Sequence, residues 1–146
     1  MQHIYQMDRL HVGKGIMIYG NREHKVLEVV WKGSTSSTEF QETAQFVLNI
    51  AQEWQINKWM INQKDMMIYP KDFEWAKQEL IPEAQKKLDK NTVVAIVLSN
   101  NLFGEFSLKQ ALNDGFPNGN LNVAYFENSD EAWCWLVECN KDLSVD

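Results

Sequence analysis

The hydrophobic pattern opens with two short β-rich runs that predict a hairpin. Residues 15–20 (GIMIYG) and 25–31 (KVLEVVW) are rich in β-branched and aromatic side chains. The polar residues 21–24 lie between the two runs and suit a turn that joins antiparallel strands. We expect a weaker strand around residues 3–7 to join this pair.

Apolar residues at helical spacing predict two helices in the middle of the chain. The first covers residues 40–54, and Ser36 precedes Glu39 in the order of an N-terminal capping box. The second begins at Pro70, a residue type that suits the first turn of a helix. We expect Pro82 to kink this second helix or to end it early, because proline removes a backbone hydrogen bond.

Strands and helices continue to alternate in the second half of the chain. Residues 58–62, 92–98 and 121–126 are predicted strands, and further helices are predicted to begin at Ser107 and Asn128. The run at 92–98 is apolar on both faces. We therefore expect it in the middle of the sheet, with helices covering both sides.

A hairpin followed by this alternation is typical of an α/β fold with right-handed crossovers. We expect a mixed, mostly parallel sheet of about four or five strands, flanked by about four helices. The length of 146 residues is near the commonest size of one domain. The sequence thus predicts a single domain over residues 1–146, with its core at about 15–137.

The charge balance argues against a nucleic-acid partner. The formal net charge is −6, and Arg9 and Arg22 are the only arginines. Proteins that bind nucleic acids cluster lysine and arginine to displace counterions from phosphates. The hydrophobic content of 45% is that of a packed globule.

The sequence also bears on where the protein works. Its first ten residues, MQHIYQMDRL, lack the basic start and apolar run of a secretory signal. No apolar run approaches the roughly 20 residues of a membrane span. We expect a cytoplasmic protein without a membrane span, in which Cys134 and Cys139 remain free thiols.

No catalytic motif stands out. The three histidines lie in the N-terminal segment or the hairpin turn, away from any recognisable nucleophile motif. Lys14 lies in a GKG sequence, but the spacing of a phosphate-binding loop is absent. The sequence predicts a protein that is not an enzyme, with no catalytic residue, no metal ligand and no cofactor.

Four stretches of the chain resemble STAS domains, the family named for sulfate transporters and anti-sigma factor antagonists. They are KVLEVVWKGSTSSTEFQ, KWMINQKD, AIVLSNNLFGEFSLKQ and VAYFENSDEAWCWL. The resemblance covers roughly residues 15–137 at the level of pattern and points to a bacterial branch of small standalone STAS-like proteins. It implies an α/β fold and a regulatory role through protein binding.

One feature of the family is missing from this chain. In anti-sigma factor antagonists, a serine or threonine at the start of the helix after the strand matching 58–62 is phosphorylated and switches partner binding. The matching stretch here, NQKDMMIYPKDFEW, contains neither residue. Asp65 has two interpretations, either a permanent negative charge in place of the phosphate or an ordinary loop acid.

Two apolar loops form the candidate binding site. One follows the strand at 58–62 and the other follows the strand at 92–98, so both should emerge at the carboxyl edge of the sheet. Ligands of open α/β sheets bind at that edge, and apolar loops there indicate a surface to be covered. The alternative is that these side chains fold back and cap the core. The candidate residues are Asp65, Met66, Met67, Ile68, Tyr69, Leu102, Phe103 and Phe106.

The sequence therefore predicts a non-catalytic interaction or regulatory module. Its expected partner is another protein or a second copy of the chain, which would give a homodimer. The alternative is a carrier of a small apolar or lipid-like ligand, since STAS-like folds are similar in architecture to CRAL-TRIO lipid carriers.

Overall fold

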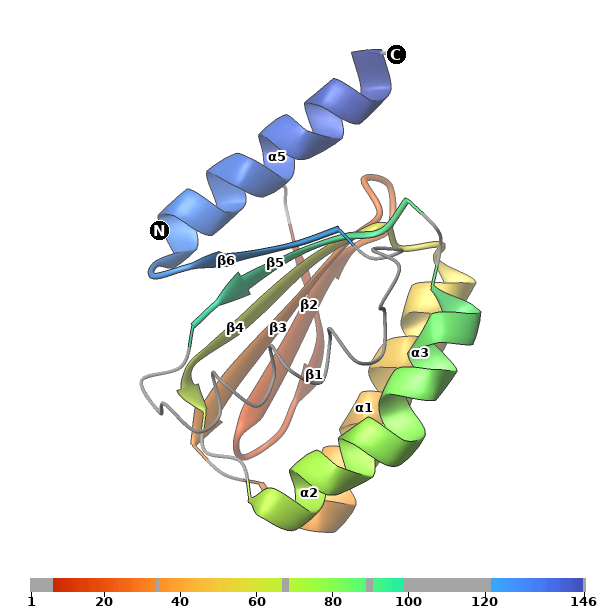
Figure 1. Ribbon diagram of the computed structural model, residues 1–146, viewed down its shortest axis with the longest axis vertical. Coiled ribbons are helices and arrows are strands. Elements are labelled where there is room, and N and C mark those ends of the chain that lie inside the picture. The colour runs from red at the N-terminus through yellow and green to blue at the C-terminus, as the bar shows by residue number, and fades with distance from the viewer. Residues whose placement is uncertain (1–6, 34, 67–68, 89–90, 99–121, 146) are drawn as a thin grey trace.

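A computed structural model describes residues 7–33, 35–66, 69–88, 91–98 and 122–145. These residues form one sheet of six strands whose spatial order equals their order in the chain (Figure 1). The strands are β1 (Asp8–Val12), β2 (Ile16–Asn21), β3 (Val26–Gly33), β4 (Lys58–Met66), β5 (Val93–Val97) and β6 (Asn122–Phe126).

The sheet is mixed, as the sequence predicts. Strands β1, β2 and β3 are antiparallel, whereas β3 to β6 are all parallel. The predicted hairpin is confirmed as β2 and β3. The predicted strand count of four or five is wrong, because the sheet has six strands.

The edge strand β1 was not predicted from the hydrophobic pattern. The weak strand expected around residues 3–7 lies outside the described residues except for Met7, whereas β1 covers Asp8–Val12. Its sequence, DRLHV, carries few apolar residues, and its pairing with β2 is interrupted by an irregularity between Arg9 and His11. This irregularity breaks the simple alternation that a sequence pattern detects.

Three helical bodies pack on the sheet within the described residues. They are α1 (Ser37–Glu53), a continuous rod made of α2 (Pro70–Trp75), the π-helical turn η1 (Ala76–Leu80) and α3 (Ile81–Lys87), and α5 (Ser129–Val145). The helix predicted to begin at Ser107 lies outside the described residues. In the described part of the chain, no helix is both long and apolar enough to cross a membrane.

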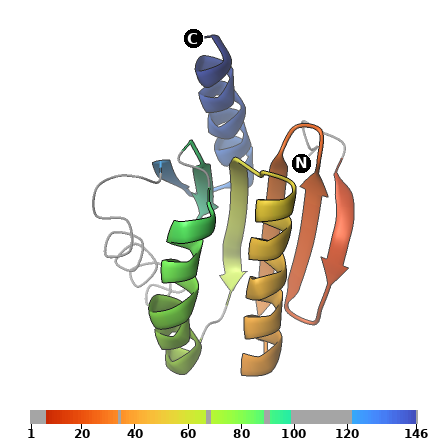
Figure 2. The ribbon, with the colours of Figure 1, turned by 90° about the vertical axis from the view of Figure 1, so that its right-hand side faces the viewer.

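Helices cover both faces of the sheet. Figure 2 shows α1 and α3 side by side on one face, and Figure 1 shows α5 on the other. The predicted run at 92–98 becomes β5, whose five residues are all buried. It lies between β4 and β6, so it is an interior strand but not the central one.

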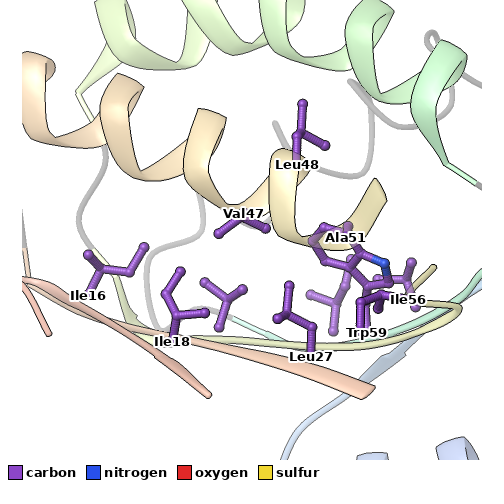
Figure 3. Close-up of a cluster of buried hydrophobic side chains, with 11 residues drawn as sticks. Ile16, Ile18, Leu27, Val47, Leu48, Ala51, Ile56 and Trp59 are labelled. Carbon is purple, nitrogen blue, oxygen red and sulfur yellow. The ribbon is translucent and has the colours of Figure 1, made fainter. Parts of the chain in front are cut away.

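The core has two layers, one on each face. The larger layer lies between the sheet and the helices α1 and α3 (Figure 3) and consists of Ile16, Ile18, Leu27, Val29, Val47, Leu48, Ala51, Ile56, Trp59, Val94 and Ile96. The smaller layer lies under α5 and consists of Val26, Met60, Val93, Ala95, Val97, Ala132, Trp133 and Leu136.

Side-chain caps fix the starts of α1 and α5, as expected from the sequence. The Glu39 backbone N–H donates to Ser36 Oγ at 3.1 Å. The Glu131 backbone N–H donates to Asn128 Oδ1 at 2.9 Å, and Asn128 Nδ2 donates back to Glu131 Oε1 at 3.0 Å. The bonds from the Glu39 and Glu131 backbone N–H groups satisfy donors that the first helical turn leaves without partners.

Pro82 does not end the second helix. The rod continues to Lys87, and the π-helical turn η1 ends at Leu80, two residues before Pro82. In this turn the Ile81 backbone N–H donates to the carbonyl of Ala76, five residues back. The wider turn accommodates a proline, which lacks an N–H and would clash with the preceding turn of a regular α-helix.

Candidate functional site

The carboxyl ends of the parallel strands meet at one edge of the sheet, which we call the carboxyl edge. Strand β1 runs in the same direction as β3, because both are antiparallel to β2. Its last residue, Val12, therefore lies at this edge too. One continuous row of paired residues crosses the whole sheet here: Val12, Met17, Val30, Asn62, Val97 and Phe126.

Strand β4 extends farther at this edge than the sequence predicts. The expected strand ended at 62, but β4 continues to Met66 and pairs there with Gly33 of β3. Its pairing with β5 stops at Asn62, so its last four residues extend past β5. From Val30 to Lys32 the β3 register advances two residues while β4 advances from Asn62 to Asp65, which indicates a bulge in β4.

The structure describes part of the predicted site. Asp65 and Met66 are strand residues rather than loop residues, and the Asp65 side chain is exposed. Tyr69 directly precedes α2 and is 49% exposed. The other predicted residues, Met67, Ile68, Leu102, Phe103 and Phe106, lie outside the described residues, and their place at the edge remains a prediction.

Two exposed apolar side chains lie at the carboxyl edge. Among the described residues, the exposed large hydrophobic side chains are Val12, at 56% exposure, and Tyr69, at 49%. Val12 was missed by the sequence analysis, because the direction of an edge strand cannot be known before its pairing is known. The described exposed apolar residues of this edge thus lie on β1 and just before α2.

Three aromatic rings stack where β3 leads into α1 and where α2 ends. The ring centroids of Trp31 and Phe40 are 5.3 Å apart, and those of Phe40 and Trp75 are 6.0 Å apart in an edge-to-face arrangement. Such pairs are favourable beyond the burial of their surface. These ring contacts connect β3, α1 and α2 near the carboxyl edge.

A second concave feature lies on the outer side of the helical layer. It is an open groove of about 660 Å³ between α1 and the α2–α3 rod. We call it the helix groove. Its lining includes the aromatic side chains Phe46 and Trp75 and the carboxylates Glu42, Glu79 and Glu83. The groove could not be predicted from the sequence, because it exists only where two helices lie side by side.

Two buried ionisable residues lie on the α5 side of the sheet. Glu28 of β3 is 5% exposed, and burial raises the pKa of its carboxyl group from 4.5 to about 7. Lys58 of β4 is also 5% exposed, and its pKa is lowered by burial and then by the charge of Lys25. Lys58 Nζ donates to Asn57 Oδ1 at 3.3 Å.

The topology of the crossovers limits what kind of cleft can form at the edge. Both described crossovers, through α1 and through the α2–α3 rod, pack on the same core layer and hence on the same face. Doubly wound folds bind nucleotides where the strand order reverses and neighbouring crossovers diverge to opposite faces. The strand order here does not reverse among the six described strands.

The chain was compared with protein-family models, curated proteins and solved structures. No family model matches it, no curated protein matches it, and no solved structure matches it.

Proposed function

We propose that this chain is a non-catalytic, cytoplasmic interaction module of the STAS-like kind. In this proposal it binds another protein, or a second copy of itself, through the carboxyl edge. The observation that carries the proposal is the exposure of Val12 and Tyr69 at that one edge. Exposure of apolar side chains to water is unfavourable in free energy, and a partner that covers them removes this unfavourable contribution.

The chemistry of the edge fits protein recognition. Tyrosine is enriched in the energetic centres of interfaces, because its ring buries apolar area while its hydroxyl keeps a polar contact. Tyr69 stands at the junction of β4 and α2, and α2 is anchored by the ring contact between Phe40 and Trp75. A rigid support of this kind lowers the entropy lost when the side chain is held in an interface.

The family resemblance supports a regulatory role, since STAS domains act by binding partner proteins. The stretch after β4 lacks the serine or threonine that those proteins phosphorylate. We therefore propose constitutive binding rather than a phosphorylation switch.

The test is to place a charge in the apolar edge. Tyr69→Asp and Val12→Asp should each weaken self-association, or binding of a captured partner, by about tenfold or more. Native mass spectrometry of the purified chain reports both dimers and retained ligands, and sedimentation velocity measures the affinity. Met67→Asp and Phe103→Asp extend the test to the predicted loop residues.

A matched control uses Gln55→Asp, an exposed position just beyond the end of α1. This variant introduces the same negative charge away from the carboxyl edge and should bind normally. If the edge variants and the control bind equally well, the edge is not the interface. A co-purified apolar ligand whose retention depends on Phe103 would instead favour the lipid-carrier alternative.

A further inference from the structure

The helix groove combines three features on a surface distinct from the carboxyl edge. It is concave, it carries two aromatic side chains, and it is lined by carboxylates without any lysine or arginine. Each of the two aromatic side chains contacts another ring of the protein. Phe46 contacts the ring of His11 at 5.8 Å between centroids, and Trp75 contacts Phe40 at 6.0 Å.

The carboxylates face the groove largely without counter-ions. Glu83 pairs with Lys87 at 3.1 Å, whereas Glu42 and Glu79 make no ion pair with the described residues. Glu79 and Glu83 also lie one turn apart on the same rod, where like charges repel each other. A cationic partner would relieve this repulsion.

The geometry suits an extended cationic segment better than a metal ion. In the described part of the chain, no three acidic, histidine or cysteine side chains are close enough together to hold a metal. Each wall of the groove spans nine residues, from Gln41 to Asn49 and from Trp75 to Glu83, and the eight helical rises between their ends cover roughly 12 Å. A stretch of roughly four extended residues covers that length.

We propose that the helix groove binds an arginine-bearing segment of a partner protein. A guanidinium group stacks on an aromatic face and forms two parallel hydrogen bonds with a carboxylate, which an ammonium group does not. The chain already shows this stacking, because Arg22 lies over the ring of Trp54 at 5.6 Å. The proposal is independent of the function assigned to the carboxyl edge.

A second copy of the chain is the less suitable occupant. The sequence has two arginines, and one of them, Arg22, is already stacked on Trp54. The net charge of −6 further opposes docking of a second copy on an acidic surface. A basic segment of a different protein has the complementary charge.

The experiment measures fluorescence anisotropy of a fluorescein-labelled octapeptide of alternating arginine and glycine, titrated with the full chain. The test variant is Glu42→Lys/Glu79→Lys/Glu83→Lys. The control is Glu23→Lys/Glu53→Lys/Glu127→Lys, at exposed positions outside the groove. Each triple changes the net charge by three times +2, from −6 to 0, so the two proteins differ in where the charge lies and not in its amount.

The groove variant should bind the arginine peptide about tenfold or more weakly than the unmodified chain, and the control should lose less than about threefold. The lysine version of the peptide should bind more weakly than the arginine version. Circular dichroism checks folding, and the conservative triple Glu→Gln at the same groove positions should also weaken binding. Tyr69→Asp should leave peptide binding unchanged, which separates this proposal from the edge proposal.

Three results would overturn the proposal. Equal losses in the groove and control variants would mean that overall charge attracts the peptide. Equal affinity for the lysine and arginine peptides would mean that stacking of guanidinium groups on Phe46 and Trp75 does not contribute to binding. A dimer that dissociates only in the groove variant would show that the groove is a contact between copies of this chain.

Discussion

Glu28 is a carboxyl group buried in the interior of the sheet, where charge is costly. Strand pairing places Tyr19 and Met60 on either side of it. Burial raises its pKa from 4.5 to about 7, so the folded protein holds this proton more tightly than the unfolded chain does. The stability that follows is fully present below pH 4.5 and is lost as the pH rises through about 7.

Replacing this residue should change how stability depends on pH. Between pH 5 and pH 8, Glu28→Gln should gain roughly 2–3 kcal/mol of unfolding free energy relative to the unmodified protein, because it has no carboxyl group to ionise. Urea unfolding at the two pH values measures the difference. Glu23→Gln, at an exposed position, is the control and should show no such trend. Parallel behaviour of the two variants would mean that Glu28 titrates normally.

At the scale of elements, the start of α1 depends on one hydroxyl group. Ser36 Oγ accepts the Glu39 backbone N–H at 3.1 Å, and α1 supplies Val47, Leu48 and Ala51 to the larger core layer. Ser36→Ala should lower the unfolding free energy by about 1 kcal/mol, because a backbone donor loses its partner. Ser37→Ala, one residue inside the helix, is the matched control and should cost little, since alanine is a good helix former. If denaturant titrations show the same loss of unfolding free energy in both variants, Ser36 does not act as a helix cap.

The α2–α3 rod shows an element whose type could be predicted although its geometry could not. Proline is a reliable sign of disturbed helical hydrogen bonding, and the disturbance does occur at Pro82. Whether the helix kinks, ends or widens its turn at the proline depends on how its side chains pack against the core. The π-helical turn keeps Leu80 and Ala84 on the core layer, so burial of these side chains favours continuing the rod.

For the whole molecule, strong local patterns account for most of what could be predicted. The hairpin, the helix at 40–54 and the buried strand at 92–98 have periodic or fully apolar sequences, and all three are present. β1 was not predicted because its pairing with β2, rather than its own composition, makes it a strand. Val12 and the helix groove escaped prediction since each depends on which segments become neighbours.

The single domain predicted from the length can be tested through its two core layers. Trp133 under α5 is 1% exposed, and Leu48 of α1 is 4% exposed on the other face. Trp133→Ala should cost roughly 3–5 kcal/mol and Leu48→Ala roughly 2–5 kcal/mol. In both variants, circular dichroism and tryptophan fluorescence should report one coincident transition. Separate transitions in the Trp133→Ala protein would show that α5 and its layer unfold independently.

The agreement between strand order and chain order has a consequence for synthesis on the ribosome. Each described strand pairs with the one made just before it, so the sheet can grow from β1 toward β6 as translation proceeds. The helix α5, which covers Val26, Met60 and Val93, is translated after all six strands. Until then this apolar surface of the nascent chain has no α5 to bury it, and it is the surface that a chaperone would shield.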